Sequence, residues 1–312
     1  MKNGQPVVLV TGANGFVGRH VTPALIREGW VVRRAVRKSS GAEGETVIET
    51  LGPSTNWQDA LVDVDAVVHL AARVHQHQEQ GVELYWDVNI GGTLHLASSA
   101  KQAGVRQFIF VSTVLVHGRS NDGRPPFSES DTLMPRGLYG ESKAAAEAGL
   151  KALAQTGEMQ ITVIRPPLVY GSGAKGNFAL LARAVKLGMP LPFAAIRNHR
   201  AFLSVENLAS FISMRLSKPG EKFETFLVAD AEQVSTPDFI RRLGRAAGTR
   251  SRLFPMPISL LSGLLTISGR KEAHDSLIGS LELDLSKAAS TGWRPKVTLD
   301  EGLQRALRTP IA

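Results

Sequence analysis

Near its beginning the chain reads Val7-Val8-Leu9-Val10-Thr11-Gly12-Ala13-Asn14-Gly15-Phe16-Val17-Gly18. Its apolar, β-branched start predicts a buried strand, and the segment 19–28 after the three glycines has the pattern of a helix. A glycine-rich turn between a strand and a helix indicates a dinucleotide site, because the helix N-terminus favours a pyrophosphate. The spacing is Gly-x-x-Gly-x-x-Gly rather than Gly-x-Gly-x-x-Gly. The residues that we expect to bind the cofactor here are Gly12, Asn14, Gly15, Phe16, Val17 and Gly18.

Apolar runs alternate with helical patterns through the first half of the chain. The runs lie at 7–10, 31–36, 66–70, 108–112 and 161–165, and the helical patterns at 19–28, 89–103 and 139–156. Apolar strands separated by helices predict a parallel sheet that is covered on both faces. Because crossovers between parallel strands are right-handed, we expect an α/β fold with a Rossmann-type doubly wound sheet. Ligands then bind at the carboxyl ends of the strands.

The second half has shorter segments and more Pro and Gly, which indicates a smaller C-terminal domain. We therefore assign 1–165 to a dinucleotide-binding domain, to which some later segments return. Residues 166–312 are assigned mainly to a substrate-binding domain.

The stretch Leu138-Tyr139-Gly140-Glu141-Ser142-Lys143 opens an alanine-rich run that predicts a helix. Positions four apart share one face of a helix, so Tyr139 and Lys143 point the same way. An ammonium beside a phenol lowers the pKa of the phenol, which would allow proton transfer near neutral pH. The same spacing also occurs in an ordinary helix with an exposed Tyr and a solvated Lys.

Three further motifs accompany the glycine turn and the Tyr–Lys pair. They are Val67-Val68-His69-Leu70-Ala71-Ala72, Val111-Ser112-Thr113 and Arg165-Pro166-Pro167-Leu168-Val169-Tyr170-Gly171. Together, over roughly residues 7–307, the chain resembles the extended short-chain dehydrogenase/reductase family, in its NAD-dependent nucleotide-sugar epimerase/dehydratase branch, which includes UDP-glucose 4-epimerases and UDP-4-keto-6-deoxy-hexosamine reductases.

The resemblance implies the roles of three catalytic residues. Tyr139 would exchange a proton with a sugar oxygen that Thr113 polarises, and Lys143 would lower the pKa of Tyr139 and bind the nicotinamide ribose. Further cofactor contacts are implied for Leu70, Ala71, Ala72, Ser112, Tyr139, Lys143 and Pro166. The implied substrate-binding residues are Thr113, Tyr139, Asn177 and Arg200. Asn177 and Arg200 would contact the sugar-nucleotide pyrophosphate, and the alternative is that both are polar surface residues.

The segment Arg33-Arg34-Ala35-Val36-Arg37-Lys38 follows the expected course of the second strand. An NAD-specific fold usually places a carboxylate there for the ribose 2′-hydroxyl, whereas this chain offers Arg37 for a 2′-phosphate. The prediction favours NADP(H), with NAD(H) as the alternative.

The implied function is NAD(P)-dependent oxidoreduction at C4 of a UDP-linked sugar in bacterial surface-polysaccharide synthesis. We favour a 4-keto-6-deoxy-sugar reductase, with a UDP-hexose 4-epimerase as the alternative. A 4,6-dehydratase is disfavoured because Val114-Leu115 stand where such relatives carry an Asp-Glu pair. A catalytically silent dinucleotide-sensing protein is the alternative from another class.

Composition bears on partners and location. The 36 basic and 28 acidic residues give a net charge of +8, but without an aromatic-interleaved basic stripe we expect no nucleic acid partner. The polar N-terminus, the absence of cysteine and an apolar stretch at 255–268 too short for a bilayer predict a cytoplasmic protein without a membrane partner. The three histidines 69, 75 and 77 lack a suitable further ligand, so we expect no metal. A homodimer through the helices after Asn89 and Tyr139 would be usual for the family.

Overall fold

The structure is a computed structural model that describes residues 4–74, 81–267 and 277–308. The chain divides into two compact units. The first consists of Met1–His117, Thr132–Pro166 and Ala209–Phe226, and the second of Gly118–Asp131, Pro167–Leu208 and Leu227–Ala312. The division after Pro166 lies next to the predicted boundary, whereas the assignment of Gly118–Asp131 to the second unit was not predicted.

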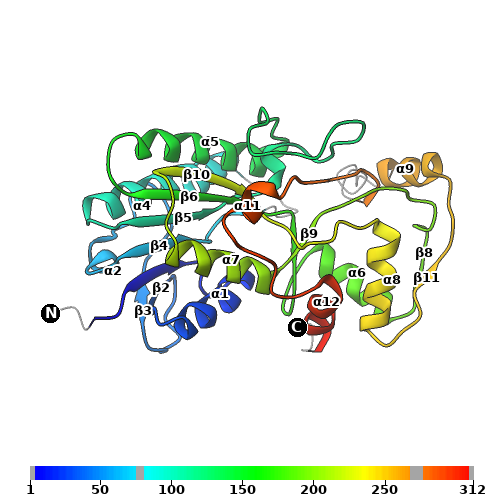
Figure 1. Ribbon diagram of the computed structural model, residues 1–312, viewed down its shortest axis with the longest axis horizontal. Coiled ribbons are helices and arrows are strands. Elements are labelled where there is room, and N and C mark those ends of the chain that lie inside the picture. The colour runs from blue at the N-terminus through cyan, green and yellow to red at the C-terminus, as the bar shows by residue number, and fades with distance from the viewer. Residues whose placement is uncertain (1–3, 75–80, 268–276, 309–312) are drawn as a thin grey trace. The chain divides into compact units, whose positions relative to one another are not determined.

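The first unit is built around a seven-stranded sheet with the order β10-β6-β5-β4-β1-β2-β3 (Figure 1). The strands are β1 Val7–Thr11, β2 Val31–Val36, β3 Glu45–Val47, β4 Ala66–His69, β5 Gln107–Val111, β6 Gln160–Arg165 and β10 Phe223–Leu227. β1 pairs in parallel with both β2 and β4, and the pairs β2–β3, β4–β5 and β5–β6 are parallel as well. The predicted α/β fold with a doubly wound parallel sheet is confirmed.

Helices cover both faces of this sheet. The helical segments of this unit are α1 Phe16–Arg27, α2 Gln58–Leu61, α3 Val82–Tyr85, the π-helical segment η1 Trp86–Gly91, α4 Gly92–Gln102, the 3-10 turn η2 Val114–Val116, α5 Gly137–Ala154 and the later part of α7 Val205–Ser217. α4 and α5 lie on one face, and α1 and α7 on the other (Figure 1). The helix predicted at 89–103 therefore begins earlier than expected, because η1 and α3 precede α4 without a break.

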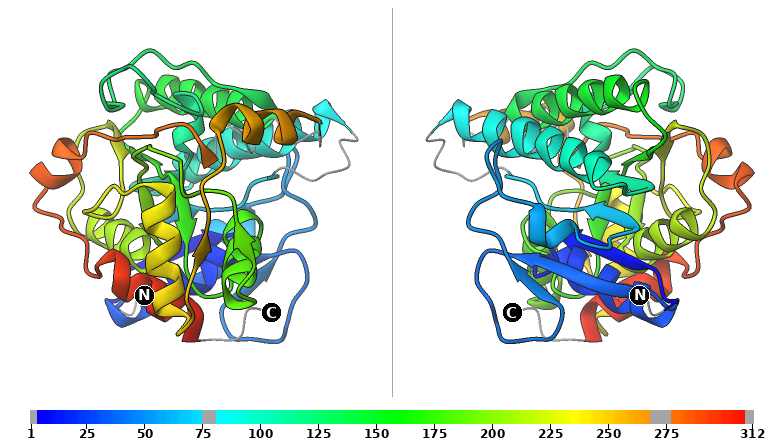
Figure 2. Two further views of the ribbon diagram at one scale, coloured as in Figure 1. Left: turned by 90° about the vertical axis from the view of Figure 1, so that its right-hand side faces the viewer. Right: turned by 90° about the vertical axis from the view of Figure 1, so that its left-hand side faces the viewer.

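The second unit contains two small sheets. β7 Leu168–Tyr170 pairs with β9 Phe202–Ser204, and β8 Pro190–Leu191 pairs with β11 Arg252–Leu253. Its helices are α6 Asn177–Lys186, α8 Thr236–Ala246, α9 Ile258–Ile267, α11 Ser286–Ser290 and α12 Leu299–Arg308. α8 packs against both α6 and α12 (Figures 1 and 2). Of the helices in the described residues, none has the length and apolar character needed to cross a bilayer.

An aromatic cluster forms the core of the second unit. Phe239 of α8 stacks on Phe202 with 4.0 Å between the ring centroids, and Tyr170 meets Phe239 edge to face. The Tyr170 hydroxyl donates to Asp230 at 2.7 Å, and burial next to this carboxylate raises the pKa of Tyr170. These interactions tie β7, β9 and α8 together around one buried centre.

Candidate functional site

The glycine turn between β1 and α1 requires residues without side chains. Gly12 has φ +67°, and a Cβ there would lie 2.8 Å from the backbone nitrogen of Ala71. A Cβ on Gly18 would overlap the carbonyl oxygen of Gly12, which accepts a hydrogen bond from the N–H of Gly15 at 2.9 Å. Glycine at 12 thus lets the end of β1 approach the end of β4, and glycine at 18 lets α1 pack against the turn.

The arrangement around this turn fits a dinucleotide. The strand order reverses between β1 and β4, and in such sheets ligands bind outside the carboxyl ends at that point. Leu70, Ala71 and Ala72 follow β4 and are partly exposed. No side chain caps the N-terminus of α1, so its first N–H groups can bind an anion. We infer that the predicted turn residues and 70–72 would hold the pyrophosphate end of the cofactor.

The side chain of His69 has a structural role. Its Nδ1 lies 2.7 Å from the Thr11 hydroxyl, and its Nε2 lies 3.0 Å from the Thr93 hydroxyl, which links β1, β4 and α4. Burial lowers the pKa of His69 to about 3, so the ring is neutral. Residues 75–80, with the other two histidines considered for a metal, lie outside the described residues. Within the described residues no cluster of His, Cys, Asp and Glu could hold a metal ion.

Thr113 lies just after the carboxyl end of β5. It precedes η2, and its hydroxyl oxygen accepts a hydrogen bond from the N–H of Leu115 at 3.2 Å. The N–H of Val114 donates to the carbonyl of Pro166 at 2.9 Å, so the ends of β5 and β6 meet here. The neighbouring Ser112 directs its hydroxyl to Glu147 at 2.5 Å, and its predicted cofactor contact stays a prediction.

A close helix approach brings Tyr139 to this edge of the sheet. A Cβ on Gly140 would lie only 3.1 Å from the carbonyl oxygen of Leu115, so glycine lets the first turns of α5 pack on η2. Tyr139 is half-buried, and no hydrogen bond to its hydroxyl is formed by any described residue. The hydroxyl remains available to a ligand.

The structure corrects the predicted effect of Lys143 on Tyr139. The Nζ of Lys143 donates to the carbonyl of Val111 at 2.8 Å and lies 4.1 Å from the centre of the Phe110 ring. Burial lowers the pKa of Lys143 to about 7, against the opposing effect of the Glu147 carboxylate. Burial also raises the pKa of Tyr139 to about 12, whereas the sequence predicted a lowered value. The reason is that desolvation disfavours the phenolate, and the lysine is engaged with a backbone carbonyl.

A buried ionic network behind Lys143 was missed by the sequence analysis. Glu147 lies one turn after Lys143 on α5, and its Oε2 is 2.6 Å from Nη2 of Arg165 at the end of β6. Nη1 of Arg165 lies 2.9 Å from Nε2 of His117. The spacing of 139, 143 and 147 on one helical face was a signal that could have identified Glu147.

Arg37 differs from the two arginines of β2. Arg33 donates to the carbonyls of Ala60 and Val62, and Arg34 donates to the carbonyl of Glu43. Arg37 follows β2 as an exposed residue, without an ion pair or hydrogen bond of its side chain among the described residues. Of these three arginines, Arg37 is the one that a ligand could engage without competing contacts.

The predicted substrate residues Asn177 and Arg200 belong to the second unit, whereas Thr113, Tyr139 and Lys143 belong to the first. Asn177 is exposed and begins α6. Arg200 is buried, and its guanidinium donates to the carbonyl of Gly279. Arg200 therefore has a structural contact that the sequence did not indicate, and its contact with substrate stays a prediction.

The parallel sheet, with a glycine turn at the point where the strand order reverses, is the fold of a dinucleotide-binding protein. Comparisons with known proteins identify the family to which the chain belongs. The model of the NAD dependent epimerase/dehydratase family matches residues 8–229. The chain is 36% identical over 306 residues to the UDP-glucose 4-epimerase of Vibrio cholerae, covering 96% of this chain and 93% of that protein.

Two further proteins agree with this match. N-acetyl-alpha-D-glucosaminyl-diphospho-ditrans,octacis-undecaprenol 4-epimerase of Escherichia coli O157:H7 is 28% identical, with 96% of this chain and 94% of that protein covered. The crystal structure of UDP-N-acetylglucosamine 4-epimerase from Bacillus cereus superimposes with a TM-score of 0.81 at 20% identity, covering 97% of this chain and 100% of the other. The chain belongs to the NAD-dependent epimerase/dehydratase family and is an enzyme. The family resemblance seen in the sequence is confirmed.

Proposed function

We propose that this enzyme inverts the configuration at C4 of a UDP-linked sugar. The observation that supports the proposal is that α5, which carries Tyr139 and Lys143, packs against the end of β5 and against η2, which follows Thr113. The glycine turn and residues 70–72 would hold NAD(P), which would supply reversible hydride transfer at C4, and inversion results when the keto sugar is reduced on its opposite face. As a phenolate, Tyr139 would take the proton of the C4 hydroxyl and give it back, while Thr113 would donate a hydrogen bond to the same oxygen. Because burial alone raises the pKa of Tyr139 to about 12, this step needs the positive charge of the oxidised cofactor to favour the phenolate.

Epimerisation is preferred here to the ketoreduction favoured by the sequence. Two curated relatives that align over nearly the whole chain bear the names of 4-epimerases. Ketoreduction of a 4-keto-6-deoxy sugar remains the second candidate because Arg37 is exposed and free of competing contacts, which suits NADPH. The two reactions differ in their net consumption of cofactor. Epimerisation leaves the cofactor unchanged, whereas each reduction converts one NADPH to NADP⁺.

The sugar carrier is proposed to be a nucleoside diphosphate. UDP-glucose is named for one relative and a sugar diphosphate of undecaprenol for another, and both carriers present a diphosphate. We place the reaction in bacterial surface-polysaccharide synthesis, in the cytoplasm, with the enzyme as a homodimer. Light scattering after size-exclusion chromatography would measure the assembly directly.

The test measures C4 inversion and cofactor consumption with one preparation. UDP-glucose and UDP-N-acetylglucosamine are incubated without added cofactor, and the C4 epimers are followed by NMR. UDP-4-keto-6-deoxy-hexosamine with NADPH is followed by the loss of nicotinamide absorbance. We expect many turnovers of inversion in the first assay, and stoichiometric NADPH oxidation without inversion would overturn epimerisation in favour of reduction.

Tyr139→Phe supplies the matched control for both assays. The substitution removes only the hydroxyl, so fold and cofactor binding should persist while turnover falls by about 10²–10⁴-fold, the contribution of a positioned proton donor. Near-normal turnover of this variant on the converted substrate would contradict the assignment of Tyr139.

A further inference from the structure

The segment after β4 passes from the glycine turn to the neighbourhood of α5 within three residues. The N–H of Ala71 donates to the Thr11 hydroxyl at 3.3 Å, and a Cβ on Gly12 would touch the same nitrogen. Two residues later, the N–H of Arg73 donates to the side-chain oxygen of Asn89 at 2.8 Å, and the Asn89 amide donates to the carbonyl of Arg73 at 3.0 Å. The backbone of Arg73 is therefore fixed next to the expected cofactor site.

Asn89 connects this segment to α5. Its amide also donates to the Ser142 hydroxyl at 3.0 Å, and that hydroxyl donates to the carbonyl of Tyr139 at 2.9 Å. Asn89 is buried and lies in η1, and π-helical turns of this kind are frequent at functional sites. Arg73 is thus tied through one buried side chain to the turn of α5 that carries Tyr139.

The guanidinium of Arg73 has no acceptor among the residues that the structure describes. It lies over the ring of Tyr85, 5.6 Å from the ring centre, and Tyr85 is buried. Its Nε is closed to solvent and forms no hydrogen bond, and its Nη atoms form neither a hydrogen bond nor an ion pair within the described residues. A buried N–H group without an acceptor destabilises the folded chain, so this arrangement requires an explanation.

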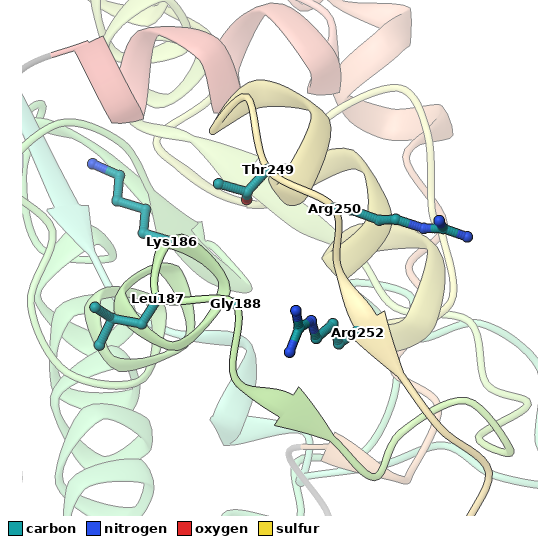
Figure 3. A pocket seen from close by; sticks show the side chains of 6 residues that line it. All are labelled: Lys186, Leu187, Gly188, Thr249, Arg250 and Arg252. Atoms are coloured by element: carbon teal, nitrogen blue, oxygen red, sulfur yellow. The ribbon is translucent and has the colours of Figure 1, made fainter.

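Unpaired arginines that are exposed carry no such cost. Arg250 and Arg252 line an open hollow of about 590 Å³ in the second unit and form no ion pair with any described residue (Figure 3). Both are exposed, so water can accept hydrogen bonds from their N–H groups. The Nε of Arg73 is shut off from this solvent. The missing acceptor is therefore informative at Arg73 and uninformative at the hollow.

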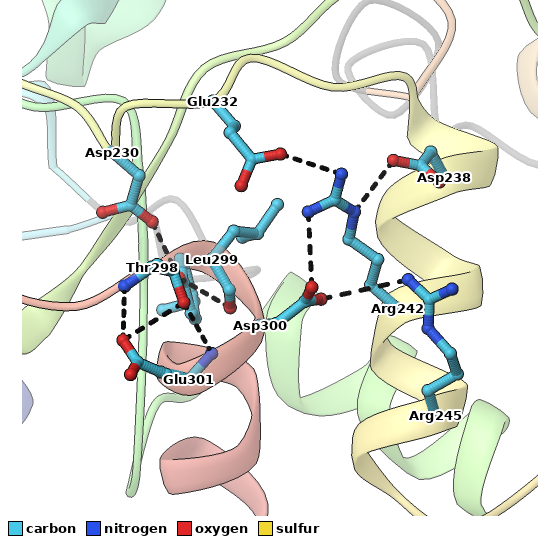
Figure 4. A network of polar contacts seen from close by, with 10 residues as sticks. Asp230, Glu232, Asp238, Arg242, Arg245, Thr298, Leu299, Asp300 and Glu301 are labelled. Atoms are coloured by element: carbon cyan, nitrogen blue, oxygen red, sulfur yellow. Dashed lines mark hydrogen bonds and ion pairs between the residues drawn. The ribbon is translucent and has the colours of Figure 1, made fainter.

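Other arginines that are buried or half-buried have oxygen acceptors. Arg242 is 17% exposed and contacts the carboxylates of Glu232, Asp238 and Asp300 (Figure 4). Carbonyl or carboxylate oxygens also accept from the guanidinium groups of Arg33, Arg34, Arg165, Arg200 and Arg215. Arg73 is half-buried and departs from this pattern.

We propose that Arg73 binds an oxyanion of a ligand between the glycine turn and Tyr139, either a phosphate of the dinucleotide or an anionic group of the sugar substrate. A guanidinium presents a planar fork of N–H groups that matches phosphate and carboxylate oxygens. To reach the oxyanion, the side chain would turn away from the Tyr85 ring. This movement breaks no hydrogen bond and gives the unpaired N–H groups acceptors, while the contacts with Asn89 keep the backbone in place.

The two sources of the oxyanion rest on different grounds. The dinucleotide follows from membership of the NAD-dependent family, whereas the sugar substrate rests on the proposed function. Binding measurements separate the two, because each ligand can be titrated by itself.

The test compares the wild type with Arg73→Met, which keeps the length and the apolar stem of the side chain but removes its charge. NADH is titrated by fluorescence, and UDP-glucose and UDP-N-acetylglucosamine are titrated by calorimetry with the cofactor bound. We expect the affinity for at least one ligand to fall by about 10- to 100-fold, the range for hydrogen bonds to a charged group. A loss with NADH identifies a phosphate of the dinucleotide, and a loss confined to the UDP-sugars identifies the substrate. Arg73→Lys keeps the charge without the fork, so its loss should be smaller.

Arg215→Met is the matched control. Like Arg73, Arg215 lies over an aromatic ring, 4.9 Å from the centre of Phe226, and has a buried Nε without an acceptor. Its charge, however, is paired with Glu224. Arg215→Met should therefore lower the midpoint of urea denaturation and leave ligand affinities unchanged. Arg73→Met should do the opposite, because it removes no hydrogen bond of its side chain from the free protein.

Unchanged affinity of Arg73→Met for NADH and for both UDP-sugars would overturn the proposal. A lowered denaturation midpoint in that variant would then show that Arg73 serves only to pack on Tyr85. Failure of the wild type to bind either UDP-sugar would count against the proposed function, and the NADH titration alone would then decide the role of Arg73.

Discussion

The ammonium nitrogen of Lys143 lies 2.8 Å from the carbonyl oxygen of Val111, the last residue of β5. This hydrogen bond fixes the first turns of α5 against the strand that leads to Thr113. It also holds a cation in a buried position, and burial lowers the pKa of Lys143 to about 7. The position of α5 and the protonation of Lys143 are therefore linked to the same buried contact.

The low pKa of Lys143 predicts a specific pH dependence of stability. Between about pH 7 and 10.5 the folded chain has lost a proton that the unfolded chain still binds. The free energy of unfolding of the wild type should therefore rise with pH relative to Lys143→Met, by at most about 1.4 kcal/mol per pH unit. Below pH 7 the difference should be constant, because both states are then protonated. Urea denaturation across this range measures it.

Lys151→Met is the control for this experiment, because Lys151 is exposed on the same helix. Its stability should follow that of the wild type at every pH. A Lys143→Met curve parallel to the wild type would show that the lysine keeps an ordinary pKa.

Cofactor preference depends on Arg37. If its guanidinium contacts a 2′-phosphate, Arg37→Ala should weaken NADPH binding by about 1–3 kcal/mol, the contribution of a hydrogen bond to a charged group. NADH binding should change little. Fluorescence titration with both reduced cofactors measures this, with Arg27→Ala, an exposed arginine in the last turn of α1, as the control. Equal losses for NADPH and NADH would refute selection by Arg37.

The sequence predicted the central strands well because their apolar runs are continuous. The run at 31–36 coincides with β2, and 161–165 differs from β6 by one residue. β3 and β10 were not predicted, since Glu45–Val47 and Phe223–Leu227 are short and partly polar. Their place in the sheet is decided by pairing with β2 and β6 rather than by local pattern.

The difference between local sequence patterns and contacts of distant segments also applies to the site. The glycine turn and the Tyr139–Lys143 pair are local in sequence, so their spacing indicated them once the accompanying motifs were taken into account. The raised pKa of Tyr139 depends on burial, which no spacing reports. Pairing of Glu147 with Arg165 joins residues on a helix and on the following strand, and the structural contact of Arg200 reaches Gly279. Such long-range contacts become visible only in the folded chain.

Gly12 can be tested against a glycine with a similarly positive φ. Gly12 and Gly104 have φ of +67° and +79°, but nothing lies within 4 Å of a Cβ on Gly104. Gly104→Ala should therefore lower the free energy of unfolding by about 1–2 kcal/mol, through backbone strain alone. Gly12→Ala adds an overlap with the backbone of Ala71, so it should lose more stability and also cofactor affinity. Urea denaturation and NADH titration compare the two, and similar losses in both would contradict the close approach of β1 and β4.

The last prediction concerns the buried Glu147–Arg165 pair, whose side chains are only 4% and 7% exposed. Glu147→Gln keeps the shape but leaves the Arg165 charge buried without its counter-ion, which should lower the free energy of unfolding by about 3–5 kcal/mol. The control is Glu158→Gln, because the Glu158–Lys222 pair has a similar distance of 2.9 Å but is largely exposed. Its loss should stay below about 1 kcal/mol. Adding Arg165→Met to Glu147→Gln removes the unpaired charge and should recover part of the stability. Urea denaturation of the wild type, Glu147→Gln, Glu158→Gln and Glu147→Gln/Arg165→Met measures these differences. Equal losses of unfolding free energy in Glu147→Gln and Glu158→Gln would show that burial does not govern the strength of the Glu147–Arg165 pair.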